Sequence, residues 1–131
     1  MSEIRATTIS DAAGTGPITL TKQSAAKAWI SVNQTSTQAI LNSTNVTSIT
    51  DQGLGLTTVN YLSAMSSATY SAISTGNALN YSGSQGGVQS AGNGVSGGTK
   101  TAGRHTIDSR DTTNNYRDTD DASSAVFGDL A

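Results

Sequence analysis

The amino-acid sequence predicts an all-β domain, an antiparallel β-sandwich with a jelly-roll-like arrangement, over residues 24–131. Short segments between Ala28 and Ile73 alternate apolar and polar side chains with a period of two, which is typical of strands with one buried face. Stretches rich in glycine, asparagine and serine separate these segments and are expected to form turns. No segment shows the 3.6-residue period of an amphipathic helix, so successive antiparallel strands are the expected architecture.

Large apolar side chains are scarce in this chain. Ser, Thr, Asn and Gly make up 62 of the 131 residues, whereas Ile, Leu, Val and Phe make up only 22. This share lies below the ~20% that usually accompanies an independent core. A subunit with so little apolar surface gains stability when it shares its core with copies of itself. The composition therefore favours a homo-oligomer.

The composition also excludes several classes of function. The chain has no cysteine, which removes disulfides, thiolate chemistry and Cys-ligated zinc. A net charge of -2, with 12% charged residues, leaves no basic surface for nucleic acid or anionic lipid. No apolar run approaches the ~20 residues of a transmembrane helix, and the first ten residues lack the apolar region of a secretory signal. We therefore expect neither a nucleic-acid partner nor membrane insertion.

Residues 1–23 form the first unit of the expected domain division, an extended N-terminal arm or attachment segment. The stretch from Gly14 to Pro17 pairs two glycines with the only proline, so it cannot lie inside a helix. Residues 17–21 (PITLT) then alternate as a short strand. Two interpretations stay open for this unit: an edge strand with a loop, or an extended arm that crosses to a neighbouring subunit.

The segment AWISVN at 28–33 is the first predicted strand of the sandwich. Ile30 and Val32 share one of its faces, and Trp29, the only tryptophan, lies on the other. Three explanations stay open for a tryptophan opposite the aliphatic face. Trp29 packs against the second sheet, or it is a subunit-interface residue that contacts another protomer, or it stacks on a ligand.

Residues 39–50 are expected to form one strand, or a pair of short strands with a kink. The three-residue spacing of Val46 and Ile49 breaks strict alternation and predicts a bulge or a strand end. Residues 51–55 (DQGLG) follow and predict a hairpin loop with positive φ at its glycines.

Two further strands are predicted before the composition changes. Residues 56–62 alternate cleanly, with Val59 and Tyr61 on one face. Residues 66–74 predict the next strand, with Tyr70 among the side chains of one face.

The region 74–103 is rich in glycine and serine and holds 9 of the 14 glycines. We expect a long surface loop there, or a pair of weak strands inserted in the sandwich. Alternation resumes with His105 and Ile107 on one strand face, and residues 111–121 read as a polar loop. The last residues, which include Phe127, predict a closing strand tied into the sheet.

Four stretches resemble a small β-sandwich domain found at the tips of tail fibres and in related virion structural proteins of tailed phages, especially marine and cyanobacterial ones. They are residues 7–29 (TTISDAAGTGPITLTKQSAAKAW), 45–55 (NVTSITDQGLG), 62–74 (LSAMSSATYSAIS) and 126–131 (VFGDLA). Residues 75–121 do not share the resemblance. The bulky aromatic that usually follows the tryptophan in this family is replaced here by the sequence Ile30-Ser31-Val32.

The resemblance implies a homotrimer exposed on the virion, with attachment to the host surface as its function. Its partners would be other copies of itself, other virion proteins and a host surface glycan or protein. The resemblance leaves an alternative open, a virion decoration or assembly subunit on the capsid or head that does not contact a receptor.

No stretch carries a catalytic, cofactor or metal motif, so we expect no enzyme. The glycines at 53 and 55 lack the continuation of a phosphate-binding loop. Asp118, Asp120 and Asp121 offer oxygen ligands for calcium, but their spacing is not that of an EF-hand, and a solvated acidic loop is the alternative. His105 is the only histidine, so a typical zinc site is excluded.

The loops supply the candidate receptor-binding residues, whose rings and polar groups suit sugars through stacking and adaptable hydrogen bonds. The two tyrosines among them have a second interpretation as buried anchors that hold the loops. The candidates are Tyr81, Asn114, Asn115, Tyr116 and Arg117.

Overall fold

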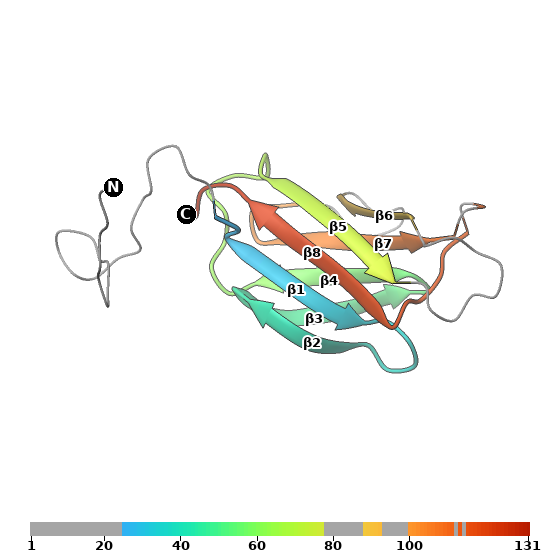
Figure 1. The fold of residues 1–131 in the computed structure, drawn as a ribbon. Coiled ribbons are helices and arrows are strands. Elements are labelled where there is room, and N and C mark those ends of the chain that lie inside the picture. Colours follow the sequence, from blue (N-terminus) through green and yellow to red (C-terminus); the bar gives the residue numbers. More distant parts are fainter. Residues whose placement is uncertain (1–24, 78–87, 93–99, 112, 114) are drawn as a thin grey trace, which may run out of the picture.

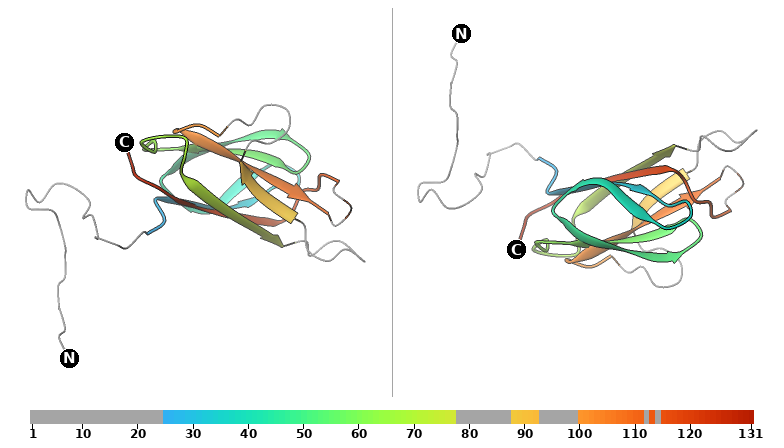
Figure 2. Two further views of the ribbon diagram at one scale, coloured as in Figure 1. Left: turned by 90° about the horizontal axis from the view of Figure 1, so that it is seen from above. Right: turned by 90° about the horizontal axis from the view of Figure 1, so that it is seen from below.

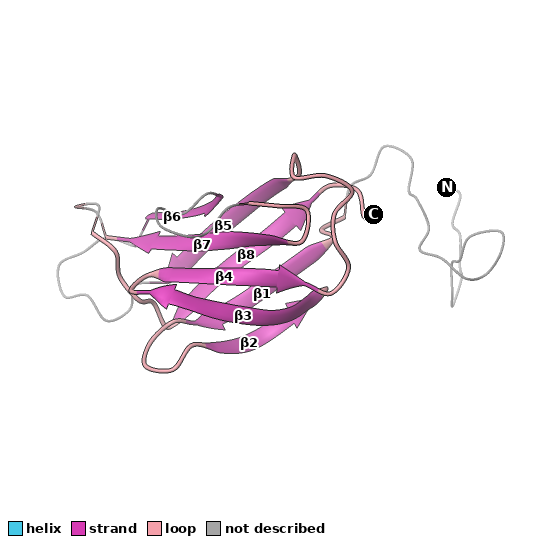
Figure 3. Ribbon diagram, turned by 180° about the vertical axis from the view of Figure 1, so that it is seen from behind, coloured by secondary structure: helices cyan, strands magenta, loops and turns pink. Residues whose placement is uncertain are grey.

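Two four-stranded antiparallel sheets pack face to face and form a β-sandwich (Figure 1). The structure is a computed structural model that describes residues 25–77, 88–92, 100–111, 113 and 115–131. Strands and loops, but no helix, make up these residues (Figure 3). The strands are β1 (Ala28–Asn33), β2 (Ala39–Thr44), β3 (Val46–Gly53), β4 (Leu56–Tyr61), β5 (Ser71–Asn77), β6 (Val88–Gly92), β7 (Arg104–Arg110) and β8 (Asp121–Phe127).

The strand order is β2-β1-β8-β5 in the first sheet and β3-β4-β7-β6 in the second. The predicted antiparallel β-sandwich is therefore confirmed. β1 and β2 form a hairpin within one sheet, and β3 and β4 form a hairpin within the other. Long-range pairing of β1 with β8 and of β4 with β7 then joins the hairpins to the rest of each sheet.

The core follows the alternation of the sequence. On β1, Ile30 and Val32 are buried while Trp29 faces outward, and on β8 the buried residue Val126 alternates with Ala125. Burial of these aliphatic side chains from both sheets is the main apolar contribution to stability. The core cluster consists of Ala28, Ile30, Val32, Val59, Tyr61, Met65, Tyr70, Ile107, Ala122 and Val126.

The chain changes sheets at Asn45, between β2 and β3. Asn45 has a left-handed backbone conformation (φ 56°), which asparagine tolerates better than most residues. Its side-chain amide donates to the carbonyls of Lys27 and Ser63 at 3.0 Å each and accepts from the Ser63 N–H at 2.7 Å. Residues 39–50 are therefore the pair of short strands with a kink, and the predicted bulge lies between Val46 and Ser48.

One predicted boundary was wrong. The strand expected over residues 66–74 begins only at Ser71, because the preceding residues form a turn in which the Ser67 and Thr69 hydroxyl oxygens lie 2.6 Å apart. Of the two alternatives for the region 74–103, the structure favours strands, since β5 extends to Asn77 and β6 lies within the region. Residues 78–87 and 93–99 of this region, and the arm at 1–23, lie outside the described residues.

The sandwich has two different ends (Figure 2). At one end, Lys27 donates its backbone N–H to Val126 at 2.7 Å, and the C-terminal residue Ala131 donates to Ala64 at 3.0 Å. The described chain therefore enters and leaves the fold at this end, which we call the terminal end. The loops β1–β2, β3–β4 and β7–β8 meet at the opposite end, which we call the distal end (Figure 1).

Gly55 is required at the distal end for two reasons. Its φ is +68°, and a Cβ atom there would lie 2.5 Å from the Ser109 carbonyl oxygen and 2.7 Å from the Arg117 nitrogen. Gly53 also has a positive φ, of +114°, but a Cβ atom there meets nothing within 4 Å. A side chain at Gly53 would therefore strain only the backbone, whereas a side chain at Gly55 would also collide with neighbouring atoms.

We predict that Gly55→Ala lowers the free energy of unfolding by more than about 2 kcal/mol, because it adds a collision to a left-handed backbone. Gly53→Ala should cost about 1 kcal/mol, and Gly103→Ala, which is unobstructed, less than about 0.5 kcal/mol. Urea unfolding followed by circular dichroism measures all three. Equal losses for Gly53→Ala and Gly55→Ala would contradict the close approach at Gly55.

Candidate functional site

The distal end is organised by the buried side chain of Gln34. Gln34 is 1% exposed, and its amide oxygen accepts hydrogen bonds from the hydroxyls of Ser109 (2.7 Å) and Thr119 (3.1 Å). Its Nε2 donates to the Thr57 hydroxyl at 3.0 Å. One amide thus connects the β1–β2 loop with β4, β7 and the β7–β8 loop, and a buried amide is stable only with such partners.

A second amide extends this network toward the surface. The Thr57 hydroxyl donates to Gln38 Oε1 at 2.7 Å, and Gln38 Nε2 donates to the Leu56 carbonyl at 3.2 Å and to Asp51 Oδ1 at 3.0 Å. The β1–β2 loop is therefore tied to both strands of the β3–β4 hairpin.

Backbone groups complete the connection between the loops. Gly55 accepts from the Ser109 N–H at 2.8 Å and donates its own N–H to Asp118 Oδ1 at 2.7 Å. The Gln34 N–H donates to the Thr119 carbonyl at 2.8 Å. These bonds hold the hairpin and the β7–β8 loop in one arrangement at the distal end.

The β7–β8 loop is folded around the carboxylate of Asp111. Asp111 Oδ1 accepts from the backbone N–H groups of Thr113 and Asn115, both at 2.9 Å, and from the Thr113 hydroxyl at 2.7 Å. Asp111 Oδ2 lies 3.0 Å from Arg117 Nε. The Asn115 N–H, the Thr113 hydroxyl and Arg117 hold the pKa of Asp111 well below its usual range, so this carboxylate stays ionised near neutral pH.

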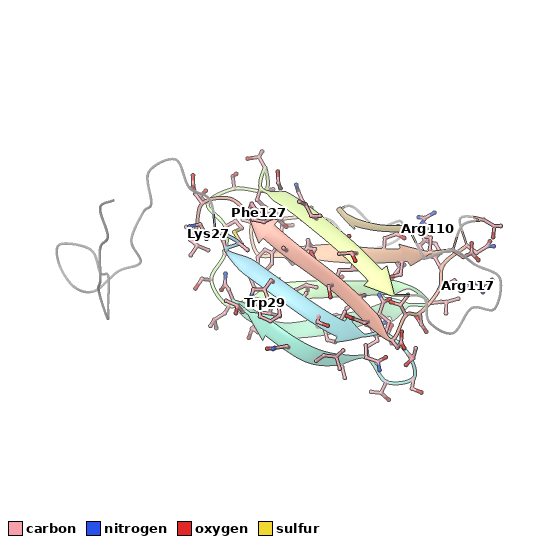
Figure 4. The ribbon with its side chains drawn as sticks, viewed as in Figure 1. Lys27, Trp29, Arg110, Arg117 and Phe127 are labelled. Carbon is pink, nitrogen blue, oxygen red and sulfur yellow. The ribbon has the colours of Figure 1, made fainter. Side chains whose placement is uncertain are left out.

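Arg110 presents the aromatic ring of this loop. Its guanidinium group makes two bonds of 2.8 Å to the Asp108 carboxylate, which raise the pKa of Arg110. The same group lies 4.2 Å from the centre of the Tyr116 ring, and its Nη2 donates to the Tyr116 hydroxyl at 2.8 Å. The cation and the carboxylate thus position a half-buried tyrosine at the distal end, where Figure 4 shows Arg110 and Arg117.

The structure brings three of the five candidate receptor residues together. Asn115, Tyr116 and Arg117 lie in the β7–β8 loop, where Asn115 is exposed and the other two are half-buried. Tyr81 and Asn114 lie outside the described residues. Tyr116 has features of both an anchor of the loop and an accessible ring, because Arg110 holds one part of the side chain while another part stays accessible.

Asp118 and Asp121 accept hydrogen bonds from different parts of the structure. Asp118 accepts from Gly55, whereas Asp121 Oδ1 accepts from the hydroxyls of Ser31 (2.8 Å) and Ser123 (3.0 Å). Among the described residues, no group of three or more acidic or histidine side chains is placed to hold a metal ion.

Sequence reasoning missed the residues that build the distal end. Gln34 and Gln38 lie between the predicted strands at 28–33 and 39–50, and the sequence assigned them no role, since nothing local distinguishes a buried glutamine from an exposed one. Asp111 did have a signal: an aspartate followed two residues later by threonine is typical of an Asx-turn, in which the carboxylate caps the backbone ahead of it.

His105 connects the two sheets inside the core. Its Nδ1 lies 2.8 Å from the Tyr61 hydroxyl and its Nε2 lies 2.9 Å from the Ser124 hydroxyl. A histidine hydrogen-bonded to a serine resembles a Ser-His catalytic pair. However, His105 is 1% exposed and Ser124 4% exposed, and both ring nitrogens of His105 make hydrogen bonds within the core. The geometry supports a polar connection between β4, β7 and β8, and burial lowers the pKa of His105 to about 4.

Trp29 lies on the outer face of the first sheet and is 36% exposed (Figure 4). The explanation that it packs against the second sheet is therefore wrong, because the buried face of β1 carries Ile30 and Val32. A groove of about 240 Å³ opens beside it. The groove is lined by Trp29, Ile30, Ser31, Ile73, Thr75, Ser123, Ser124 and Ala125.

Comparison with protein-family models, curated proteins and solved structures found no match to this chain. In the part of the chain that the structure describes, no helix is long and apolar enough to cross a membrane.

We predict that Gln34→Ala lowers the free energy of unfolding by about 3 kcal/mol, because it leaves the buried hydroxyls of Ser109 and Thr119 without this acceptor and creates a cavity. Gln38→Ala is the matched control and should cost about 1 kcal/mol or less, since Gln38 is half-buried and water can replace it. Chemical denaturation of both variants measures the difference. Similar losses would contradict the central role of Gln34.

Stability should fall between pH 6.5 and about 4. The pKa of His105 is lower in the folded state than its ordinary value of 6.5, so the unfolded chain binds the proton more strongly in this interval. The contribution is complete above pH 6.5 and is lost as the pH falls through about 4, with a total of about 3 kcal/mol.

His105→Gln should flatten this part of the stability profile, although it also lowers stability at pH 7. Urea unfolding at half-unit steps of pH measures both curves. A profile in the variant as steep as that of the wild type would show that another group titrates.

Proposed function

We propose that this protein is a structural protein of a tailed-phage virion, located at the tip of a tail fibre or in another exposed fibre, and that it mediates attachment to the host surface as a homotrimer. The observation that carries the proposal is the separation of the two ends of the sandwich. The described chain enters and leaves at the terminal end, while three hydrogen-bonded loops meet at the distal end. A tip domain needs this polarity, with attachment to the fibre at one end and a free recognition surface at the other.

The distal end supports recognition by its chemistry. Asp111, Gln34 and Gln38 hold the loops in place, so little conformational entropy is lost when a ligand binds. The exposed polar side chain of Asn115 lies beside the half-buried ring of Tyr116. A ring with an adjacent amide suits sugar hydroxyls and the apolar face of a sugar ring. The three distal ends of a trimer would act together, so weak single contacts add to firm adsorption.

The resemblance of residues 7–29, 45–55, 62–74 and 126–131 to virion fibre domains supports the same proposal. One of these stretches, residues 45–55, includes two residues with structural roles: Asn45 at the change of sheets and Gly55 at the hairpin.

A virion decoration or assembly subunit of the capsid or head is the second candidate. The outer face of the first sheet favours it, since Trp29 and Ile73 expose apolar surface that suits contact with protein. In that case the interface itself would be the function, and the distal loops would contact no receptor.

We predict that an excess of the purified protein blocks adsorption of the phage that encodes it to host cells, and that Tyr116→Ala weakens this inhibition at least tenfold. A stacking contact contributes about 1 kcal/mol in each copy, and the loss is multiplied over the copies of an oligomer. Thr44→Ala, on an exposed edge strand, is the control and should inhibit as the wild type does.

Three results decide between the candidates. No inhibition by the wild-type protein contradicts receptor attachment and favours the assembly subunit. Equal inhibition by Tyr116→Ala and wild type, with both folded by circular dichroism, removes the β7–β8 loop from the receptor site. Immunogold labelling of intact virions should place the protein at fibre ends, and label elsewhere on the virion contradicts the tip location.

A further inference from the structure

The groove on the outer face of the first sheet has large walls and a small floor. Ala125 on β8 pairs with Trp29 on β1 and with Ile73 on β5, so the alanine lies between the two larger side chains in one row of the sheet. Ile73 is 62% exposed and Trp29 36%. The next row continues the floor with Ser123, between Ser31 and Thr75. The result is an open apolar groove along β8 that the described residues leave uncovered.

The chain itself contains a segment with matching chemistry. Residues 17–21 precede the described part and alternate, so Ile18 and Leu20 would share one face of an extended segment while Thr19 and Thr21 take the other. Two aliphatic side chains on one face, with no charge between them, fit a groove with Trp29 and Ile73 as its walls.

The segment that joins these residues to β1 favours contact with another copy. To reach its own groove, the chain would have to reverse direction between Leu20 and Ala28. Residues 18–27 contain no glycine, proline, asparagine or aspartate, the residues that favour tight reversals. The turn-forming residues, Gly14 to Pro17, lie on the far side of the apolar pair. Ten residues can span about 33 Å when extended, which is enough to reach a neighbouring sandwich.

We propose that residues 17–21 of one copy lie along the groove of a neighbouring copy, with Ile18 and Leu20 placed between Trp29 and Ile73. The arm and the groove are different surfaces of the same chain, so in the proposed homotrimer each arm would bind the groove of the next copy and the three contacts would close as a ring. It deepens the proposed function, because it rests on the self-association stated there and identifies the surfaces that produce it.

Engineered cysteines test the contact directly, since the chain has none of its own. The double variant Leu20→Cys/Ala125→Cys, in the full chain, should form disulfides between copies under mild oxidation. A non-reducing gel should then show covalent trimers as the largest species. The control Leu20→Cys/Leu54→Cys carries its second cysteine on the β3–β4 hairpin at the distal end and should stay monomeric on the gel.

The alternative occupants give different bands. A disulfide within one chain would show that the arm covers its own groove, and this would overturn the proposal. Dimers as the largest species would show reciprocal exchange between two copies and contradict the ring. Crosslinking no greater than in the Leu54 control would show that the arm does not reach the groove.

Charge substitutions provide a second test that needs no crosslink. Ile18→Asp and Ile73→Asp should each weaken association at least about a hundredfold by light scattering, because an unpaired carboxylate would be buried in the contact. Thr19→Asp, on the opposite face of the arm, and Leu54→Asp, 55% exposed at the hairpin, are the matched controls and should keep the wild-type mass. Trp29 emission should shift to longer wavelength only in the two dissociated variants.

These results separate failure of this inference from failure of the proposed function. A trimer that is unaffected by Ile18→Asp and Ile73→Asp overturns the arm contact but leaves receptor attachment intact. A wild-type protein that is monomeric at every concentration overturns both the arm contact and the homotrimer. Phage adsorption assays with the covalent trimer then report on the receptor independently of assembly.

Discussion

The scarcity of large apolar side chains is the constraint on which the rest of this structure depends. In the part of the chain that the structure describes, ten residues form the core cluster, and two of them are alanines. Hydrogen-bonded polar groups therefore occupy interior positions that aliphatic residues fill in most sandwiches. Gln34, Thr57 and Ser109 form one such group at the distal end, and His105 lies in another between Tyr61 and Ser124. Among the described residues, Ser74 is the only one with a buried side-chain oxygen that lacks a partner.

Polar interior groups give directionality that apolar packing lacks. A leucine in place of Gln34 would fill space, whereas the amide requires hydrogen-bond partners from the β7–β8 loop and from two strands, β4 and β7, at fixed angles. The distal end is thus ordered by hydrogen bonds. Within the β7–β8 loop, the carboxylate of Asp111 accepts the hydrogen bonds that fix the loop conformation. This order is what makes a recognition role for loops physically reasonable, because a fixed loop binds without first losing its conformational freedom.

The same constraint acts on the surface. While the core holds few large side chains, several others remain exposed, including Trp29, Leu41 and Ile73. Leu41 lies on β2, an edge strand whose sequence AILNST has neither a charge nor a proline to discourage further pairing. A chain with so few large apolar side chains gains stability when the exposed ones are buried against other copies. Self-association is therefore the state that the composition and the exposed faces both favour.

Local pattern by itself determined the all-β class, the placement of Trp29 on the face of β1 opposite Ile30 and Val32, the hairpin glycines and the bulge after Val46, because each depends on backbone geometry within a few residues. The start of β5 was misplaced because Ser67 and Thr69 compete for backbone groups in a turn. Only the tertiary structure decided that β1 pairs with β8, that Gln34 is buried and that Asn115, Tyr116 and Arg117 face the same end as the β3–β4 hairpin. These features come from contacts between distant segments, such as the hydrogen bond between Ser31 and Asp121, which are 90 residues apart. No local periodicity specifies which distant strand closes a sheet.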